Sequence, residues 1–205
     1  MGDPSRRRPE PIDRTADIVS GLAARFRLSA LEQRHGSTPV LGLFAFVNGC
    51  LSIALMSLVA LLTGQPFIFP SLGPTAFLLF YTPTAPAASP RNTVLGHLIG
   101  ATAGYVSLAV FGLLEAGPAL SVGVSWGRVG AAALSLGLTA GLMVWLRVPH
   151  PPAGATTLIV SLGLITTIPE LAVLMLGVVL LVGQGFVINR LAGIAYPVWS
   201  PRPST

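Results

Sequence analysis

The stretch RVPHPPAGATT, residues 147–157, interrupts an otherwise apolar part of the chain. One smooth apolar run, VGAAALSLGLTAGLMVWL, precedes it, and another, LIVSLGLI, follows it. An arginine, a histidine and three prolines therefore stand where a continuous transmembrane helix would have apolar residues. We interpret the stretch as the start of a second, shorter helix that begins inside the membrane.

The composition around this stretch is that of a protein that spans a membrane. Of the 205 residues, 52% are hydrophobic and only 9% are charged, whereas soluble domains have roughly 25% charged residues. Several runs approach the roughly 20 apolar residues that cross a bilayer. We therefore predict an all-α polytopic membrane protein with one membrane domain, residues 39–196, between polar tails at 1–38 and 197–205.

Basic residues gather in the N-terminal tail, and we interpret them as an orientation signal. Seven of the twelve lie before Pro39, mixed with five acidic residues. The net charge of +5 therefore does not indicate a nucleic-acid partner. The positive-inside bias predicts a cytoplasmic N-terminus in a bacterial inner (plasma) membrane. Within residues 14–34 the apolar residues favour one helical face, which predicts an amphipathic helix on the inner leaflet; an unstructured polar tail is the alternative.

Four strong apolar spans and two weaker ones organise the membrane domain. The strong spans are residues 40–63, 93–114, 128–146 and 170–190. The weaker segments, 67–81 and 150–166, carry prolines at the front. We therefore predict four full transmembrane helices and two proline-broken half-helix segments.

The two broken segments align with each other, which predicts an internal repeat. An offset of 81 residues places Gly73 on Gly154 and also matches a proline and a threonine beside them. The same offset superimposes the first strong span on the third and the second on the fourth. The chain thus divides into two halves, about 39–115 and about 126–196, each with a helix, a broken segment and a helix.

Charges favour an inverted arrangement of these halves. If each broken segment crosses the membrane, each half has three crossings and the halves point in opposite directions. With the N-terminus inside, this arrangement also places Arg91, Arg147, Arg190 and Arg202 inside, and Arg128 alone contradicts the bias. We therefore expect an inverted 3+3 repeat. The alternative, in which both segments dip in and return, differs by only about one arginine.

Two helix starts would meet near mid-membrane in the inverted arrangement, and they form the predicted binding site. Prolines are tolerated in the first turn of a helix, because the amides there have no intrahelical partner. Each start carries about half a positive charge, which suits a small anion. The predicted substrate-binding residues are His150, Pro151, Gly154 and Thr156 of one start and Ser71, Gly73 and Thr75 of the other. Tight packing elbows without a ligand are the alternative.

Three further polar residues are candidates for gating or access. Arg147 is expected to guard the cytoplasmic approach or simply to extend to the interface. His97 is expected to pack with one hydrogen bond or to take part in access, and Asn48 to line a path or bridge helices. His150 itself aligns with Phe69 in the repeat, so the two halves are not equivalent.

Small residues form two stripes at helical spacing, which predict close helix contacts. One stripe is Gly96, Gly100 and Gly104, and the other is Ala133, Gly137 and Gly141. The pattern does not distinguish contacts inside one chain from contacts in a homo-oligomer.

The membrane domain offers little for catalysis. It contains no Asp, two histidines, and a single cysteine, Cys50, which is expected to be a core or lipid-facing thiol. No His-x-x-x-His spacing is present. We therefore expect no enzymatic activity, no bound metal and no cofactor.

The stretch PHPPAGATT, together with FPSLGPTAFLLF and SPRNTVLGHLIG, resembles the HPP family of integral membrane proteins. The family's His-Pro-Pro signature corresponds here to His150, Pro151 and Pro152, and the resemblance covers roughly residues 38–195. It implies transport, since plant plastid and cyanobacterial members have been associated with nitrite transport. It also implies four transmembrane helices, a number from which the six-crossing arrangement departs.

The sequence therefore predicts a membrane transporter or channel for a small solute, with nitrite or a similar small inorganic anion as the substrate. The chain has no nucleotide-binding glycine loop, so a gradient or the membrane potential would drive transport. A scaffold or sensor without transport, in which the prolines only shape the fold, is the alternative.

Overall fold

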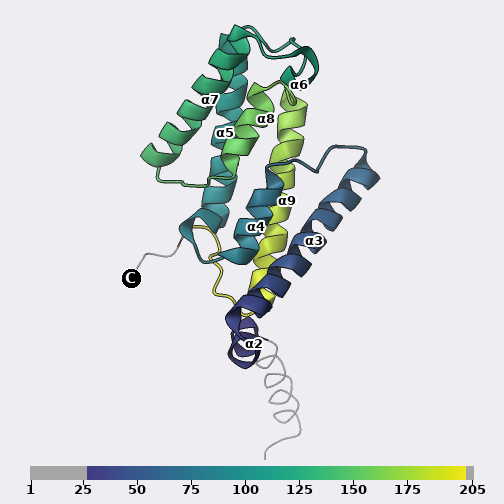
Figure 1. Ribbon diagram of the computed structural model, residues 1–205, viewed down its shortest axis with the longest axis vertical. Helices are drawn as coiled ribbons and strands as arrows, with labels where there is room; N and C mark the ends of the chain where they lie inside the picture. The colour runs from purple at the N-terminus through teal and green to yellow at the C-terminus, as the bar shows by residue number, and fades with distance from the viewer. Residues whose placement is uncertain (1–26, 202–205) are drawn as a thin grey trace, which may run out of the picture.

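The part of the chain that the computed structural model describes, residues 27–201, is a bundle of helices without a strand (Figure 1). Four helices are long and apolar enough to cross a membrane, and they correspond to the four strong spans of the sequence, so that prediction is confirmed. The helices are α2 Leu28–His35, α3 Ser37–Thr63, α4 Leu72–Tyr81, η1 Pro86–Ala88, α5 Pro90–Val110, α6 Ala119–Val122, α7 Trp126–Trp145, α8 Ala153–Ser161 and α9 Ile168–Leu191.

Two short helices, α4 and α8, stand where the sequence predicts the broken segments. They have 10 and 9 residues, which gives each a length of about 15 Å, roughly half the thickness of the hydrocarbon layer. Pro74 lies in the first turn of α4, and Pro152 is the N-cap of α8. The prolines therefore mark the helix starts, where the missing amide hydrogen has no cost.

The glycine stripe on α5 is buried against α8 of the same chain. A methyl group at Gly96 would lie 2.7 Å from Cβ of His150, and one at Gly104 would lie 2.7 Å from Cβ of Val160. The glycines thus allow close approach of the two backbones, and the order of the contacts makes α5 and α8 parallel. On the second stripe, Ala133 and Gly137 are exposed, so of the two stripes this one remains open for the predicted contact between copies.

In the other part of the bundle, α4 packs against α9 as α8 packs against α5. A methyl group at Gly177 would lie 3.6 Å from Cδ1 of Leu72 at the start of α4. One at Gly185 would lie 3.1 Å from Cδ1 of Leu79 near the end of α4. The two helices are therefore parallel, and Nδ2 of Asn189 donates to the Leu79 carbonyl at 3.0 Å.

Consecutive segments of the bundle alternate in direction. The backbone N–H of Leu28 donates to the Ala192 carbonyl, and that of Arg91 donates to the Trp199 carbonyl. α3 and α5 therefore both begin at the end of the bundle where α9 finishes. The segment between them, which contains α4, must return the chain to that end. Figure 1 shows α4 beside α9 and α8 beside α5, as these contacts require.

The opposite end of the bundle contains Arg128, the residue that contradicts the positive-inside bias. Its side chain is 2% exposed and donates to the carbonyls of Ser161 at 3.1 Å and Gly117 at 2.8 Å. Ser161 is the last residue of α8, so the guanidinium caps a helix C-terminus, which carries negative partial charge. This capping role accounts for an arginine at the end where the bias does not expect one.

The predicted bounds of the membrane domain, residues 39–196, remain a prediction. α3 begins at Ser37, close to the predicted start at residue 39. The predicted interfacial helix, 14–34, is described only from residue 27, where α2 forms, and its remainder lies outside the described residues.

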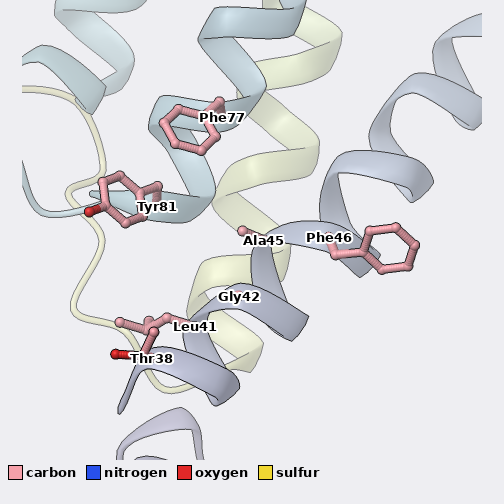
Figure 2. A pocket seen from close by; sticks show the side chains of 7 residues that line it. All are labelled: Thr38, Leu41, Gly42, Ala45, Phe46, Phe77 and Tyr81. Atoms are coloured by element: carbon pink, nitrogen blue, oxygen red, sulfur yellow. The ribbon is translucent and has the colours of Figure 1, made fainter.

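A groove of about 540 Å³ separates the first half of α3 from α4 (Figure 2). The rings of Phe77 and Tyr81 stack on the α4 side, with their centroids 5.0 Å apart, and the side chain of Phe46 points away from them in Figure 2. All three side chains are exposed. This part of the surface is therefore suited to contact with lipid, as the spanning helices imply.

Candidate functional site

Two histidines meet inside the bundle, where the start of α8 lies against α5. Nε2 of His97, on α5, is 3.2 Å from Nε2 of His150, which precedes α8. The ring planes are inclined by 57°, so the nitrogen edges face each other and the rings do not stack. Neither side chain has exposed surface. The two residues therefore form one buried polar site.

Threonine hydroxyls from both half-helices complete this site. Oγ1 of Thr75, on α4, lies 2.9 Å from Nε2 of His97 and 3.3 Å from Nε2 of His150. Oγ1 of Thr156, on α8, lies 2.6 Å from Nδ1 of His97. The structure thus brings one predicted threonine from each helix start into contact with His97.

The hydrogen-bond partner of His150 assigns its tautomer. Nδ1 of His150 lies 2.7 Å from the carbonyl oxygen of Ala87, and a carbonyl can only accept. The neutral ring therefore carries its hydrogen on Nδ1, and its Nε2 presents a lone pair to His97. Thr93 contributes a hydroxyl at 3.5 Å from the same Nδ1, at the limit of a hydrogen bond.

The partners of His97 assign its tautomer in the same way. The Thr75 hydroxyl donates to the Ser71 carbonyl at 2.9 Å, so it accepts from Nε2–H of His97. Nδ1 of His97 then accepts from the Thr156 hydroxyl. The Nε2–H of His97 is thus shared between Thr75 at 2.9 Å and Nε2 of His150 at 3.2 Å. The hydrogen bonds run from Thr156 through His97 to these two acceptors, and from His150 to a backbone carbonyl.

The short helix η1 connects this site to the C-terminal segment. Its Ala87 carbonyl accepts from His150, and the next carbonyl, that of Ala88, accepts from the hydroxyl of Tyr196 at 2.6 Å. Burial raises the pKa of Tyr196, which keeps its hydroxyl protonated as a donor. Two successive carbonyls thus hold His150 on one side and the C-terminal segment on the other.

The two predicted glycines do not face the histidines. Gly73 is exposed, and a methyl group there would meet no described atom within 4 Å. Gly154 is half-buried, with a side-chain atom of Leu136 as the nearest contact at 3.6 Å. Each glycine stands two positions before a site threonine, and residues two apart point to different sides of a helix. They therefore lie on the outer side of the helix starts, as does the exposed Pro151.

Neither Ser71 nor Asn48 has a hydrogen bond to the histidines in the described part of the chain. Ser71 is the buried N-cap of α4, and its hydroxyl has no partner within the described residues. Its contribution is the carbonyl that orients Thr75. Nδ2 of Asn48 donates to the Phe44 carbonyl one turn earlier in α3, at 2.7 Å. Asn48 is thus bonded within its own helix, and no hydrogen bond of the described residues joins it to the site.

Arg147 has a strained backbone at the end of α7. Its φ is 55°, and no other non-glycine residue in the described ranges has a positive φ. α5, α8 and α9 end with a glycine at the corresponding left-handed position: Gly112, Gly163 and Gly193. A residue with a side chain loses about 1–2 kcal/mol there, and such strain often accompanies function. The Arg147 side chain is exposed, and its carbonyl accepts from Nη1 of Arg91 at 3.3 Å.

An apolar groove of about 430 Å³ lies beside the two helix starts. Its lining residues are Pro74, Phe77, Leu78, Ala87, Pro151, Pro152 and Ala155. Pro74 directly precedes the buried Thr75, and Pro151 directly follows the buried His150. The groove and the histidine pair therefore lie on opposite sides of the same short stretches of chain.

The sequence underestimates His97 and does not reveal Ala87. His97 contacts three polar side chains, whereas the sequence predicts one hydrogen bond or an access role. Its presence inside a transmembrane span was the available signal. A backbone carbonyl such as that of Ala87 has no signal in the sequence. The described residues contain no group of three or more side chains that could hold a metal ion.

Comparison with known proteins identifies the family. The model of the HPP transmembrane region matches residues 35–197. A transmembrane protein of Dictyostelium discoideum is 37% identical over 93 residues, which cover 45% of this chain and 27% of that protein. A second one from the same organism is 31% identical over 120 residues, or 58% and 39% of the two chains.

The matches extend over less than half the length of these two relatives. No solved structure is significantly similar to the chain. The family match, however, includes all four spanning helices, both half-helices and both site histidines. The chain therefore belongs to the HPP family of transmembrane proteins.

Proposed function

We propose that this protein is a membrane transporter or channel for a small solute, with a small inorganic anion such as nitrite as the substrate. The observation that carries the proposal is the convergence of two half-helix starts on His97 and His150 inside an apolar bundle. Polar groups at that depth are costly, and they often mark the path of a solute. The choice of nitrite rests on the family resemblance, since the names of the relatives specify no substrate.

The distribution of charge supports an anion as the substrate. The N-termini of α4 and α8 carry positive partial charge next to the histidines. Among the described residues, neither ring has a carboxylate as a hydrogen-bond partner. Glu170 is occupied in the capping box at the start of α9. The positive ends of the half-helices are therefore not neutralised by a nearby acid.

The proposal includes an inverted repeat around the site. The offset of 81 residues aligns Gly104 with Gly185 and Leu79 with Val160. This alignment therefore converts the pair Gly104 and Val160 into the pair Gly185 and Leu79. Both pairs are close contacts between a long helix and a half-helix. Such reciprocal contacts are expected from a pseudo-two-fold axis in the membrane plane, an arrangement that many transporters use for alternating access.

The proposed orientation follows from the charged residues. Arg91 and Arg147 are linked at the end of the bundle where α9 and its Arg190 finish. The positive-inside bias places this end, and with it the N-terminal tail, in the cytoplasm of an inner (plasma) membrane. Because the histidines are fully buried, substrate entry requires α4 and α8 to separate, and the groove beside Pro74 and Pro151 is the proposed entry point.

A scaffold or sensor without transport is the second candidate. The complete burial of His97 and His150 is also what a solid packing elbow would have. The two candidates differ in one measurable property, the permeability that the protein confers on a membrane.

The experiment is nitrite uptake by proteoliposomes at alkaline pH, compared with protein-free liposomes. His97→Ala and His150→Ala should each slow uptake by at least about tenfold, because a hydrogen bond to a charged ligand contributes about 1.5–3 kcal/mol. His35→Ala removes the remaining histidine, which is exposed on α2, and should leave uptake unchanged. Equal uptake of nitrite and other small anions with and without protein would contradict transport and favour a scaffold or sensor.

A further inference from the structure

The hydrogen bonds of the histidine pair define how many protons its two rings hold in this arrangement. The Ala87 carbonyl requires one hydrogen on Nδ1 of His150. The 3.2 Å contact between the two Nε2 atoms has room for one hydrogen. The Nε2–H of His97, which is shared with the Thr75 hydroxyl at 2.9 Å, supplies it. A second hydrogen there would place two donors face to face. The observed contact therefore fits two neutral rings.

An anion between the rings would require a different number of protons. It needs an N–H donor from each side, and His150 presents only a lone pair at Nε2 in the neutral state. A proton on this Nε2 supplies the missing donor, and its positive charge balances the negative charge of the anion. The proton and the anion thus strengthen each other's binding, and this coupling is reciprocal.

The groups that hydrogen-bond to the histidine pair are hydroxyls and a carbonyl, so the imidazoles are the groups there that can take up a proton. The hydrogen-bonding neighbours are the hydroxyls of Thr75 from α4, Thr93 from α5 and Thr156 from α8, and the Ala87 carbonyl from η1. In the described residues, α7 and α9 give neither ring a hydrogen bond, and no carboxylate or guanidinium bonds to either ring. A proton that accompanies the anion must therefore reside on the histidines.

We propose that the His97–His150 pair takes up one proton together with each anion and releases both on the other side, so that the protein is a proton–anion symporter. This inference rests on the proposed transport function. The proton binds to Nε2 of His150, and the anion then accepts from the Nε2–H groups of both rings in place of their direct contact. Release of the proton and the anion restores that contact. The site has the same net charge before and after loading, which lowers the cost of placing an anion in a buried site.

Ion flux separates this inference from the transport proposal. In proteoliposomes with a pH-sensitive dye inside, an inward nitrite gradient should acidify the interior. Clamping the membrane potential with potassium and valinomycin should leave the rate unchanged, because the coupled step moves no net charge. Flux into protein-free vesicles is subtracted, since nitrous acid crosses lipid unaided. Nitrite uptake without protons would overturn the coupling and leave transport standing, whereas absence of uptake would overturn both.

Glutamine variants test whether the pair is the proton carrier. His97→Gln and His150→Gln keep a polar side chain but cannot gain a proton, so both should lose proton uptake coupled to nitrite. His35→Ala is the matched control and should keep the wild-type ratio of protons to anions. Glutamine variants that fold and keep the wild-type ratio would show that the proton travels elsewhere.

The shared hydrogen can also be observed without any transport assay. Nitrogen-15 NMR of labelled histidines in nanodiscs should detect hydrogens on Nδ1 of His150 and Nε2 of His97, with a scalar coupling between the two Nε2 nuclei. The His35→Ala background leaves only the pair to be assigned. Added nitrite should place a hydrogen on Nε2 of His150. A hydrogen there in the ligand-free protein, or no response to nitrite, would overturn the inference.

Discussion

His97 and His150 are in contact through their Nε2 atoms at 3.2 Å, although 53 positions separate them in the chain. Thr75 joins them from α4, at 2.9 Å from His97. The contact therefore ties both half-helices to α5. A change in any of these side chains should affect the placement of α4 and α8 together, and stability measurements can detect this.

Thr156→Val tests the hydrogen bond between Thr156 and His97. It removes the hydroxyl that lies 2.6 Å from Nδ1 of His97 and keeps the shape of the side chain. The buried Nδ1 then lacks a donor, so the free energy of unfolding should fall by about 1–3 kcal/mol. Thr63→Val, at an exposed position of α3, should change it by less than about 0.5 kcal/mol. Denaturant titration in detergent micelles measures both, and equal stability of the two variants would contradict a stabilising hydrogen bond between Thr156 and His97.

Gly100→Ala tests the close approach of α5 and α8. The new methyl group would lie 2.7 Å from the carbonyl oxygen of Ala153 and 2.8 Å from Oγ1 of Thr157. We expect a loss of about 1–3 kcal/mol from overpacking, seen as a lower Tm. Gly183→Ala on α9 is the control, because no described atom lies within 4 Å of its methyl position. Helix propensity should make that control neutral or more stable by up to about 1 kcal/mol.

Arg147→Gly should separate stability from activity. Glycine adopts the left-handed backbone at this position without strain, so the free energy of unfolding should rise by about 1 kcal/mol. Nitrite uptake should fall if Arg147 guards the cytoplasmic approach, as the sequence predicts, because the variant removes its positive charge. A lower Tm would contradict the strain argument. Unchanged uptake would assign Arg147 to the membrane interface alone.

Cysteine labelling tests the alternation of the segments in a membrane. In a Cys50→Ala background, cysteines at the exposed positions Arg34, Glu115 and Arg147 are treated with an impermeant thiol reagent. Positions 34 and 147 should react from one side, and position 115 from the other. Reaction of positions 34 and 115 from one side and of position 147 from the other would reject six alternating segments and support two re-entrant ones.

The sequence was sufficient to predict the helices and their approximate starts, for a definite physical reason. Apolar length determines α3, α5, α7 and α9, and proline determines where α4 and α8 can begin. These are local properties of the chain, so one sequence is enough to find them. The pairing of His97 with His150 depends on how α5 packs against α8, which no local pattern encodes.

The position of the two predicted glycines had a clue within the sequence. Thr75 and Thr156 face the histidines, and Gly73 and Gly154 stand two positions before them. On a helix, residues two apart cannot share a face, whereas Ser71 and Thr75, four apart, do. Helical geometry alone would therefore have excluded the two glycines from the side that the threonines occupy.

Ala87 and Ala88 are adjacent, and their carbonyls bind the ring of His150 and the hydroxyl of Tyr196. One peptide unit therefore separates the proton-holding ring from the segment that leads out of the bundle to the C-terminus. A force applied to that segment, for example by a protein attached beyond it, would tilt the Ala87 carbonyl and change the hydrogen bond that fixes the tautomer of His150. The C-terminal end thus has a mechanical route to the buried site that does not pass through any transmembrane helix.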